Sequence, residues 1–190
     1  VLYKHKIKEV KEKAKMPIEA FIHGGMCSSY SGRCTLSNSM ANRDANKGGC
    51  AHSCRWTYKL MKDNKVIGDT NFIIASCDLM SIEYIPSLLK ANVDSFKIEG
   101  RMKSVHYIAT VVNAYRRAID AYYAQGESYK ENTLFQEELK KTAHREFTTA
   151  YITGYNDRTV NYDDSQSKGT FKFIANVLED FNGEYSLIEM

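Results

Sequence analysis

The chain has 190 residues, of which 43% are hydrophobic and 26% charged, and its formal net charge is +3. It contains no apolar stretch near the roughly 20 residues that a membrane-spanning helix needs, and its start lacks the regions of a signal peptide. With only 11 Gly and 2 Pro, a disordered or fibrous chain is disfavoured. We therefore expect a folded, cytoplasmic protein of one or two domains with no membrane partner.

Basic residues are concentrated in the first third of the chain. Residues 1–65 contain 13 Lys and Arg against 5 Asp and Glu, whereas residues 66–190 contain 13 against 18. A positive surface of this kind suits an anionic partner such as RNA. Because six of the lysines lie between Lys4 and Lys15, the alternative is an ordinary solvated helix face.

The N-terminal residues predict a helix followed by a strand. Residues 1–15 carry apolar side chains at helical spacing, and Met16-Pro17 ends that pattern. Residues 18–23 alternate between two faces, one with Ile18, Ala20 and Ile22 and the other with Glu19, Phe21 and His23. This alternation is typical of a strand, and the glycines at 24 and 25 are expected to end it.

A long loop and a hairpin are expected next. Residues 24–54 are rich in Gly, Ser and Asn and show no clean period, so we interpret them as an irregular loop held by its cysteines. Residues 55–61 and 65–74 resemble strands joined by a turn at 62–64.

From Asp78 onward, helical and strand patterns alternate. An apolar stripe over 82–89 predicts a short helix with Pro86 near its start, and residues 93–99 predict a strand that Gly100 ends. Alternation of this kind predicts an α/β fold with a parallel sheet covered by helices.

The longest predicted helix runs to about Gln125, with Ser104 as its N-cap. Its inner face is expected to comprise Val105, Ile108, Val112, Tyr115, Ile119 and Tyr122. Thr133 and Gln136 have the spacing of a capping box before another helix through Ala143. After a polar stretch at 155–169, two strands flanking Asn182-Gly183 predict a C-terminal hairpin.

Four of the five cysteines fall within 28 residues, with six, fifteen and three residues between them. They are Cys27, Cys34, Cys50 and Cys54. Four thiolates suit a 4Fe-4S iron–sulfur cluster or a structural zinc ion, and the first gap is wide for a zinc knuckle. His23 or His52 could replace one thiolate, and free or disulfide-forming cysteines are the third alternative. Cys77 is expected to be a buried thiol.

Basic side chains alternate with these cysteines. Arg33, Arg43, Lys47 and Arg55 could offset the negative charge of a cluster and bind an anionic substrate. The alternative is that each caps a carbonyl or pairs with a carboxylate such as Asp44.

A second group of charged residues lies at the end of the strand predicted over 93–99. Lys97, Glu99 and Arg101 suit ligand contact or proton transfer, because charged groups at the carboxyl end of a parallel strand pack poorly. Glu19 and His23 follow a similar pattern on their own strand, so all five could converge as a catalytic group if the strands share a sheet. The alternative is that Lys97 and Glu99 only satisfy each other.

Several uncommon motifs occur in order from about residue 16 to the C-terminus. They are Phe21-Ile-His-Gly-Gly-Met-Cys27, Ser31-Gly-Arg-Cys-Thr-Leu-Ser37, the run from Arg43 to Trp56, Phe96-Lys-Ile-Glu-Gly-Arg-Met-Lys-Ser104 and His144-Arg-Glu-Phe-Thr-Thr149. With these motifs the chain resembles the peptidase U32 family. One departure is Ala150, because the family tends to have Gly followed by an aromatic residue near Thr149.

The resemblance implies a function. The family is named for collagenase-like proteases, but the branch that this sequence looks most like carries out oxygen-independent hydroxylation of RNA, notably of the tRNA wobble uridine, with prephenate as co-substrate. Carried over by position, the ligands of its 4Fe-4S cluster would be Cys27, Cys34, Cys50 and Cys54. A peptidase and a zinc-stabilised RNA-binding module remain alternatives, although the sequence contains neither His-Glu-x-x-His nor Gly-x-Ser-x-Gly.

The resemblance also implies a domain organisation. Family members have a longer chain, so residues 1–155 would form the later half of a TIM-like (β/α) barrel with a Cys-rich insertion at 24–54. Residues 156–169 would be a linker, and residues 170–190 the start of a small C-terminal β domain. The first residue, Val1, is not Met, as expected for a piece of a longer protein.

Overall fold

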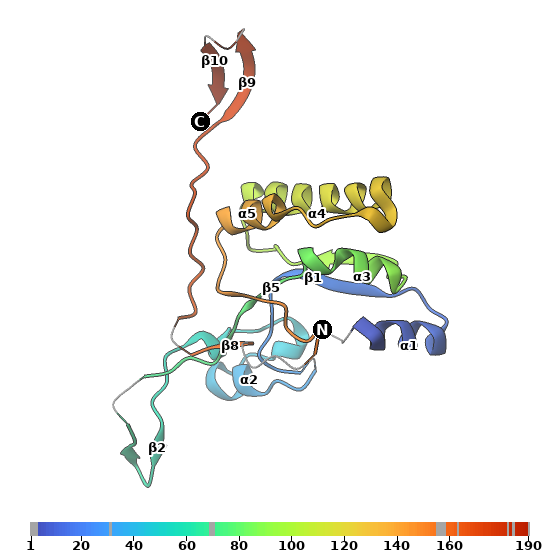
Figure 1. Cartoon of the computed structure of the whole chain (residues 1–190). Helices are drawn as coiled ribbons and strands as arrows, with labels where there is room; N and C mark the ends of the chain where they lie inside the picture. The colour runs from blue at the N-terminus through green and yellow to red at the C-terminus, as the bar shows by residue number, and fades with distance from the viewer. Residues whose placement is uncertain are drawn as a thin grey trace.

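Helices cover one face of a four-stranded sheet, and a cysteine-rich segment lies at the end of that sheet (Figure 1). The computed structural model describes residues 4–30, 32–68, 71–154, 159–162, 164–181, 183 and 185–189. The architecture is mixed α/β, as the sequence predicts.

The main sheet has the strand order β6-β1-β5-β7. Its members are β1 (Glu19–Gly25), β5 (Asp78–Met80), β6 (Ser95–Ile98) and β7 (Phe147–Thr148). β1 is parallel to β6, and β5 is parallel to β7, but β1 and β5 are antiparallel. The prediction of a fully parallel sheet is therefore wrong at this pair. β5 begins at the end of the sheet where β1 stops, because Asp78 pairs with Gly25. A parallel neighbour would have to begin at the opposite end, which requires a crossover connection.

β1 includes both of the glycines that the sequence predicts to end it, and it stops at the second, Gly25. Gly24 pairs with Leu79, and Gly25 with Asp78. The strand continues because its antiparallel partner β5 supplies a ladder over these positions.

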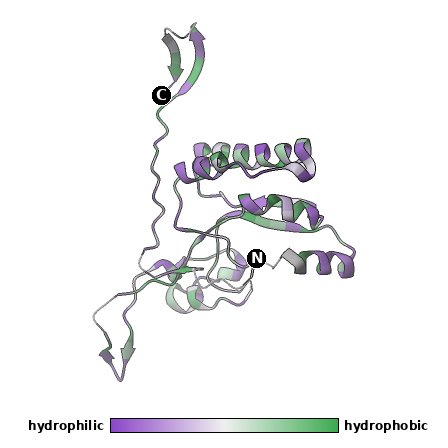
Figure 2. Cartoon of the chain, viewed as in Figure 1, coloured by the Kyte–Doolittle hydropathy of each residue, from purple (hydrophilic) through white to green (hydrophobic). Residues whose placement is uncertain are grey.

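Four helices pack around the sheet. They are α1 (Lys4–Ala14), α3 (Ile85–Lys90), α4 (Val105–Gln125) and α5 (Thr133–Lys141), with short 3₁₀ turns η3 (Ile82–Tyr84) and η4 (Gly126–Ser128) before α3 and after α4. Their buried side chains form one core with Ile22 of β1, including Ile7, Leu88, Val111 and Leu139. Polar residues dominate α1, which Figure 2 shows in purple along most of its length.

The buried face of α4 matches the prediction only in part: Tyr115 is buried and Ile119 packs against the core, as expected. Ser104 also caps the helix as expected, by accepting a hydrogen bond from the Tyr107 amide at 3.2 Å. Val105 is 85% exposed and Val112 is 47% exposed. The buried residues are Tyr107, Val111, Ala114, Tyr115 and Ala118. Alanines contribute little to an apolar stripe in a sequence, yet here they occupy the buried face.

The capping box predicted at Thr133 and Gln136 is wrong. Asn132 caps α5 through a hydrogen bond from the Leu134 amide to its side chain, at 3.0 Å. The side-chain Nε2 of Gln136 instead donates to the Glu83 carboxylate at 2.6 Å and to the Glu131 carboxylate. A side chain one residue earlier in the chain therefore satisfies the start of the helix.

The cysteine-rich residues are more ordered than the predicted irregular loop. They include α2 (Leu36–Ala41) and the 3₁₀ turns η1 (Ala45–Lys47) and η2 (Ser53–Arg55). The hairpin that follows is confirmed, but its strands β2 (Met61–Lys62) and β3 (Lys65–Val66) are far shorter than predicted.

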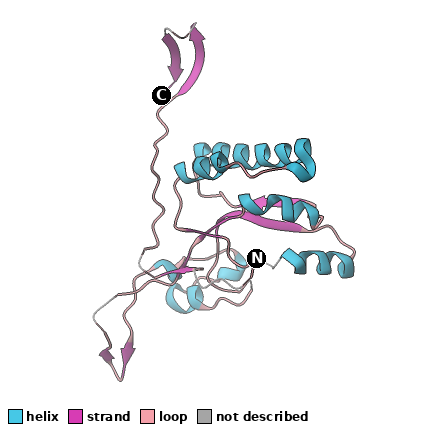
Figure 3. Cartoon of the chain, in the orientation of Figure 1, coloured by secondary structure: helices cyan, strands magenta, loops and turns pink. Residues whose placement is uncertain are grey.

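Two further strand pairs lie outside the main sheet (Figure 3). β4 (Ala75–Ser76) pairs with β8 (Val160–Asn161), and β9 (Asn176–Phe181) pairs with β10 (Tyr185–Glu189). The second pair confirms the predicted C-terminal hairpin, although Asn182 lies outside the described residues. Among the described helices, none has the length and apolar character required to cross a membrane.

Candidate functional site

A buried ion pair marks the point where β5 and β7 meet. The Arg145 guanidinium contacts Asp78 Oδ1 through Nη2 at 2.6 Å and Nε at 2.8 Å, and the Arg145 amide donates to Oδ2 at 3.0 Å. Both side chains are at most 4% exposed. Paired and multiply hydrogen-bonded, the two charges are held in fixed positions.

Glu99 lies next to this pair across the second glycine of β1. A Cβ atom at Gly25 would lie 3.2 Å from Arg145 Nη2 and 3.4 Å from Glu99 Oε2. The Glu99 amide also donates to the His23 carbonyl at 2.9 Å. Glycine at position 25 therefore leaves room for both charged groups; we call Asp78, Glu99 and Arg145 the charged centre.

The first glycine has a separate structural reason. Gly24 has φ +108°, and a Cβ there would lie 2.5 Å from the Glu99 carbonyl oxygen. Only glycine tolerates both the backbone conformation and this close approach.

His23 is fully buried beside the charged centre, and hydrogen bonding fixes its tautomer. The Tyr115 hydroxyl donates its single proton to the Ile22 carbonyl at 3.0 Å and accepts from the Ser81 amide at 3.0 Å. It lies 3.2 Å from His23 Nδ1. The proton of the Tyr115 hydroxyl and one of its two lone pairs are used by these two bonds. The remaining lone pair can only accept a hydrogen bond, so His23 donates to it from Nδ1. Nε2 is then a bare acceptor, and no described residue is its hydrogen-bond partner.

Burial also sets the charge of His23. Desolvation lowers the pKa of His23 to about 4, and the neighbouring Asp78 carboxylate only partly opposes this effect. The imidazole is therefore neutral near pH 7 and presents a hydrogen-bond acceptor, or a metal-ligating nitrogen, in a dry environment.

Lys103 and Tyr107 border the same region. Burial lowers the pKa of Lys103, while the carboxylates of Asp78 and Glu99 act in the opposite direction. Its ammonium donates to the Ala143 carbonyl at 2.7 Å and lies 4.9 Å from the centre of the Tyr107 ring. Burial also raises the pKa of Tyr107, so its hydroxyl stays protonated.

The structure brings together only part of the predicted catalytic group. β1 and β6 are neighbours, and His23 and Glu99 lie side by side. Glu19 instead pairs with Ser95 at the opposite end of β1, roughly 13 Å from His23 at the rise of a strand. Lys97 and Arg101 are exposed to solvent.

Sequence reasoning missed Asp78, Arg145, Lys103 and Tyr107 as site residues. Lys103 and Arg145 lie within motifs that supported the family resemblance, and Asp78 directly follows an apolar run. These were available signals, but nothing in the sequence pairs Asp78 with a residue 67 positions away.

The cysteines are free thiols, and two of them accept backbone hydrogen bonds. The Ser29 amide donates to Cys27 Sγ at 3.4 Å, and the His52 amide donates to Cys50 Sγ at 3.3 Å. Cys77 is buried, as predicted, and burial raises the pKa of its thiol.

Hydrogen bonds tie the segments that carry these cysteines to one another. The Ala51 amide donates to Ser37 Oγ at 2.9 Å, and the Asn46 side chain donates to the Cys34 carbonyl at 3.3 Å. From the other side, Ile74 donates to the Cys54 carbonyl at 3.2 Å, and the hydroxyl of Ser76 donates to the Met26 carbonyl.

Four cysteine side chains have the right chemistry to ligate a metal centre, but their described positions do not bring them together around one point. Within residues 4–30, 32–68, 71–154 and the later described segments, no three His, Cys, Asp or Glu side chains are placed to hold a metal ion together. The four thiols, two of which accept backbone N–H···S bonds, have the chemistry of ligands for a soft metal or an iron–sulfur cluster.

His52 links the cysteine-rich segment to the charged centre. Burial is the largest cause that lowers the pKa of His52, and the positive charge of Arg55 is the second. The charges of Arg145 and Arg43 also lower it, whereas Glu99 raises it. Of the predicted substrate-binding residues, Arg55 is half-buried, while Arg33 and Arg43 are exposed. Arg43, Arg55 and Arg145 therefore all lower the pKa of this one imidazole.

The fold and the site together define a mixed α/β protein with a buried charged centre beside a free-thiol-rich segment. The chain belongs to peptidase family U32, whose family model matches residues 2–162. The resemblance stated from the sequence motifs is thus confirmed.

Curated relatives carry two kinds of name. The chain is 45% identical over 184 residues to tRNA hydroxylation protein P1 of Bacillus subtilis, covering 90% of this chain and 43% of that protein. It is 32% identical over 153 residues to the 23S rRNA 5-hydroxycytidine C2501 synthase of Escherichia coli, covering 77% and 23%. It is also 36% identical over 140 residues to a collagenase of Porphyromonas gingivalis, covering 72% and 38%. The chain thus spans less than half the length of these relatives, and no solved structure matches it.

Proposed function

We propose that this chain contributes to the oxygen-independent hydroxylation of RNA, with the tRNA wobble uridine as the target base. The observation that carries the proposal is its 45% identity, over 90% of its length, to a tRNA hydroxylation protein. A second relative modifies a cytidine of ribosomal RNA, which supports RNA as the substrate class. The cytoplasmic location expected from the sequence is part of the proposal.

The proposed cofactor is a 4Fe-4S cluster, with zinc as the alternative. Its ligands would be Cys27, Cys34, Cys50 and Cys54, which are free and belong to segments joined by hydrogen bonds. When bound, such a cluster supplies one-electron chemistry. Support comes from the donor chemistry and from the N–H···S bonds at Cys27 and Cys50.

The residues of this chain would bind and orient the substrates. Arg33, Arg43 and Arg55 are suited to hold RNA phosphates near the cysteines. Prephenate, the proposed co-substrate, is a dicarboxylate, and Lys103 beside the charged centre offers it a cation, whereas Arg145 is buried and already paired with Asp78.

The larger architecture proposed is the later half of a TIM-like barrel over residues 1–155, a linker at 156–169 and the start of a β domain at 170–190. The parallel pairs β1–β6 and β5–β7 support it. The antiparallel pair β1–β5 argues against a continuous parallel wall at that point.

Mass spectrometry of tRNA nucleosides tests the function. A strain lacking the full-length protein should lose a hydroxylated uridine, the wild-type gene should restore it, and Cys34→Ala should not. Cys77→Ala is the matched control because this buried thiol lies outside the proposed ligand set. Full restoration by Cys34→Ala would contradict the proposal.

The collagenase relative favours peptide hydrolysis as a second candidate. Hydrolysis of gelatin by the purified protein that persists through repeated chromatography and disappears in Glu99→Gln would support it. The hydroxylation proposal predicts no such activity.

A further inference from the structure

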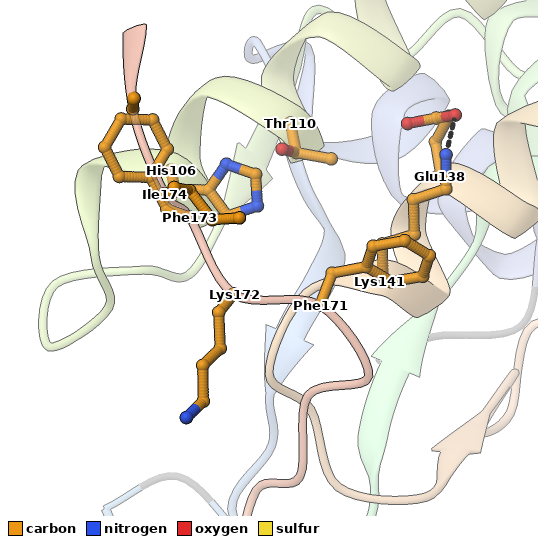
Figure 4. A pocket seen from close by; sticks show the side chains of 9 residues that line it. His106, Thr110, Glu138, Lys141, Phe171, Lys172, Phe173 and Ile174 are labelled. Carbon is orange, nitrogen blue, oxygen red and sulfur yellow. Dashed lines mark hydrogen bonds and ion pairs between the residues drawn. The ribbon is translucent and has the colours of Figure 1, made fainter. Parts of the chain in front are cut away.

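A groove lies between α4, α5 and the extended segment that follows Gly169. Its volume is ≈ 310 Å³, and the residues that shape it include His106, Thr110, Glu138, Lys141, Phe171 and Phe173 (Figure 4). We call it the linker groove, because this segment leads from the helices to the C-terminal hairpin β9–β10 (Figure 1). Neither the cysteine-rich segment nor the charged centre contributes a side chain to it.

The linker groove combines exposed aromatic rings with cations. Phe171 is 60% exposed, and the Lys141 ammonium, which also pairs with Glu138, lies 5.5 Å from the centre of its ring. Phe173 is 53% exposed, and its ring centre lies 5.8 Å from that of His106. Rings open to solvent and bordered by basic groups are the combination with which proteins bind single-stranded nucleic acid.

The aromatic rings and the Lys172 ammonium lie on different sides of the extended segment. Lys172 points away from the rings of Phe171 and Phe173 (Figure 4), as alternation in an extended chain requires. A strand whose bases stack on the rings would keep its phosphates outward, toward solvent. Lys172 is available there as a rim cation.

A second cavity adjoins the same segment and includes a residue of the charged centre. Its volume is ≈ 340 Å³, and its lining includes His144, Arg145, Lys168 and Thr170. Reciprocal backbone hydrogen bonds between His144 and Lys168, of 3.1 and 2.9 Å, hold the segment there. Thr170 lines this cavity and Phe171 lines the linker groove. Because the two residues are consecutive, the two cavities lie next to each other along one stretch of chain.

We propose that the linker groove binds a single-stranded stretch of substrate RNA beside the target base. Bases stack on Phe171 and Phe173, and Lys172 contacts a phosphate. The inference rests on the proposed function for the identity of the RNA, but the groove itself predicts binding of any unpaired strand, because every base has an aromatic face. Duplex RNA, whose bases are already stacked, should bind weakly.

Fluorescence anisotropy with a labelled ten-nucleotide oligouridine tests this site in the purified full chain. Phe173→Ala should weaken binding by about 5- to 150-fold, the range given by the loss of one stacking contact. Lys172→Gln should lower the slope of log K against log salt by about one. Tyr123→Ala and Lys8→Gln, which change exposed residues of α4 and α1, should leave binding unchanged.

A loosened segment could also weaken binding, so a second variant separates contact from structure. Phe173→Trp keeps a stacking surface and should retain the affinity, and oligouridine should quench its fluorescence beyond any change seen with Trp56 alone. Unchanged affinity in Phe173→Ala, or no added quenching in Phe173→Trp, overturns the proposal. Equal affinity for a blunt duplex of the same length does so too.

Failure of this site is distinguishable from failure of the proposed function. If Phe173→Ala binds oligouridine normally while the wild type hydroxylates tRNA, the groove is wrong and the function stands. If the wild type never hydroxylates RNA but Phe173→Ala loses oligouridine binding, the groove stands as an RNA site and the reaction is wrong.

Discussion

Asp78 and Arg145 form a buried ion pair at the meeting point of two parallel strands. Asp78 begins β5, and Arg145 lies two residues before β7; the Asp78 amide also donates to the Glu146 carbonyl at 2.9 Å. The carboxylate accepts from both the side chain and the amide of Arg145. The pair therefore fixes strand register and holds a cation next to Glu99.

Removal of one partner should leave an uncompensated buried charge. Arg145→Met is expected to lower the free energy of unfolding by about 3–5 kcal/mol, measured by urea denaturation. Arg116→Met, which breaks the exposed pair with Asp120, should have no resolvable effect. Equal losses in the two variants would show that the Asp78–Arg145 pair is not buried as described.

The lowered pKa of His23 predicts a specific pH dependence of stability. The unfolded chain takes up a proton near the ordinary value of 6.5, whereas folded His23 does so at about 4. Since the unfolded state binds more protons between these values, stability should fall as the pH falls from 6.5 to 4, by roughly 3 kcal/mol from this group.

The control for this prediction is His23→Asn, which removes the titrating group. Denaturation midpoints measured at pH 7 and pH 4.5 should differ by less in this variant than in the wild type. The same difference in both proteins would mean that His23 does not titrate below its ordinary range. Asp78, His144 and Lys103, whose charges act on the ring, are present in both proteins.

Gly24 offers a test of the backbone contact beneath the site. Gly24→Ala should cost more stability than Gly126→Ala, by at least about 1 kcal/mol, because a side chain would meet the Glu99 carbonyl, which cannot move aside like a flexible side chain. Gly126 shares the positive φ but has open space around it. Thermal unfolding of both variants measures the difference, and equal losses would assign the whole effect to φ strain.

Several local signals in the sequence predicted the local structure, although the capping box at Thr133 was wrong. Ser104 caps α4, Pro86 lies in the first turn of α3, and Gly183 lies between the strands of the C-terminal hairpin. Each of these depends on residues close together in the chain. The antiparallel pairing of β1 with β5 and the buried face of α4 depend on packing partners far away, so periodicity alone could not provide them.

The same distinction holds for the site. The four clustered cysteines are visible by counting, and the pair of His23 and Glu99 follows from two strands that share a sheet. The charged centre required Asp78 and Arg145 to meet across 67 residues, and the tautomer of His23 depends on the three hydrogen bonds of one Tyr115 hydroxyl. These features arise only when the chain folds.

Metal analysis of the full-length protein distinguishes the two proposed cofactors. Protein purified without oxygen should contain iron and acid-labile sulfide and absorb in the visible range, because four thiolates are the ligand count of a 4Fe-4S cluster. Cys50→Ser should lose most of both, since it removes a proposed ligand. Cys77→Ser should keep them, because Cys77 is buried outside the cysteine-rich segment. One zinc per chain with no iron would contradict the cluster and leave the zinc-stabilised alternative, while normal iron and sulfide in Cys50→Ser would remove Cys50 from the ligand set.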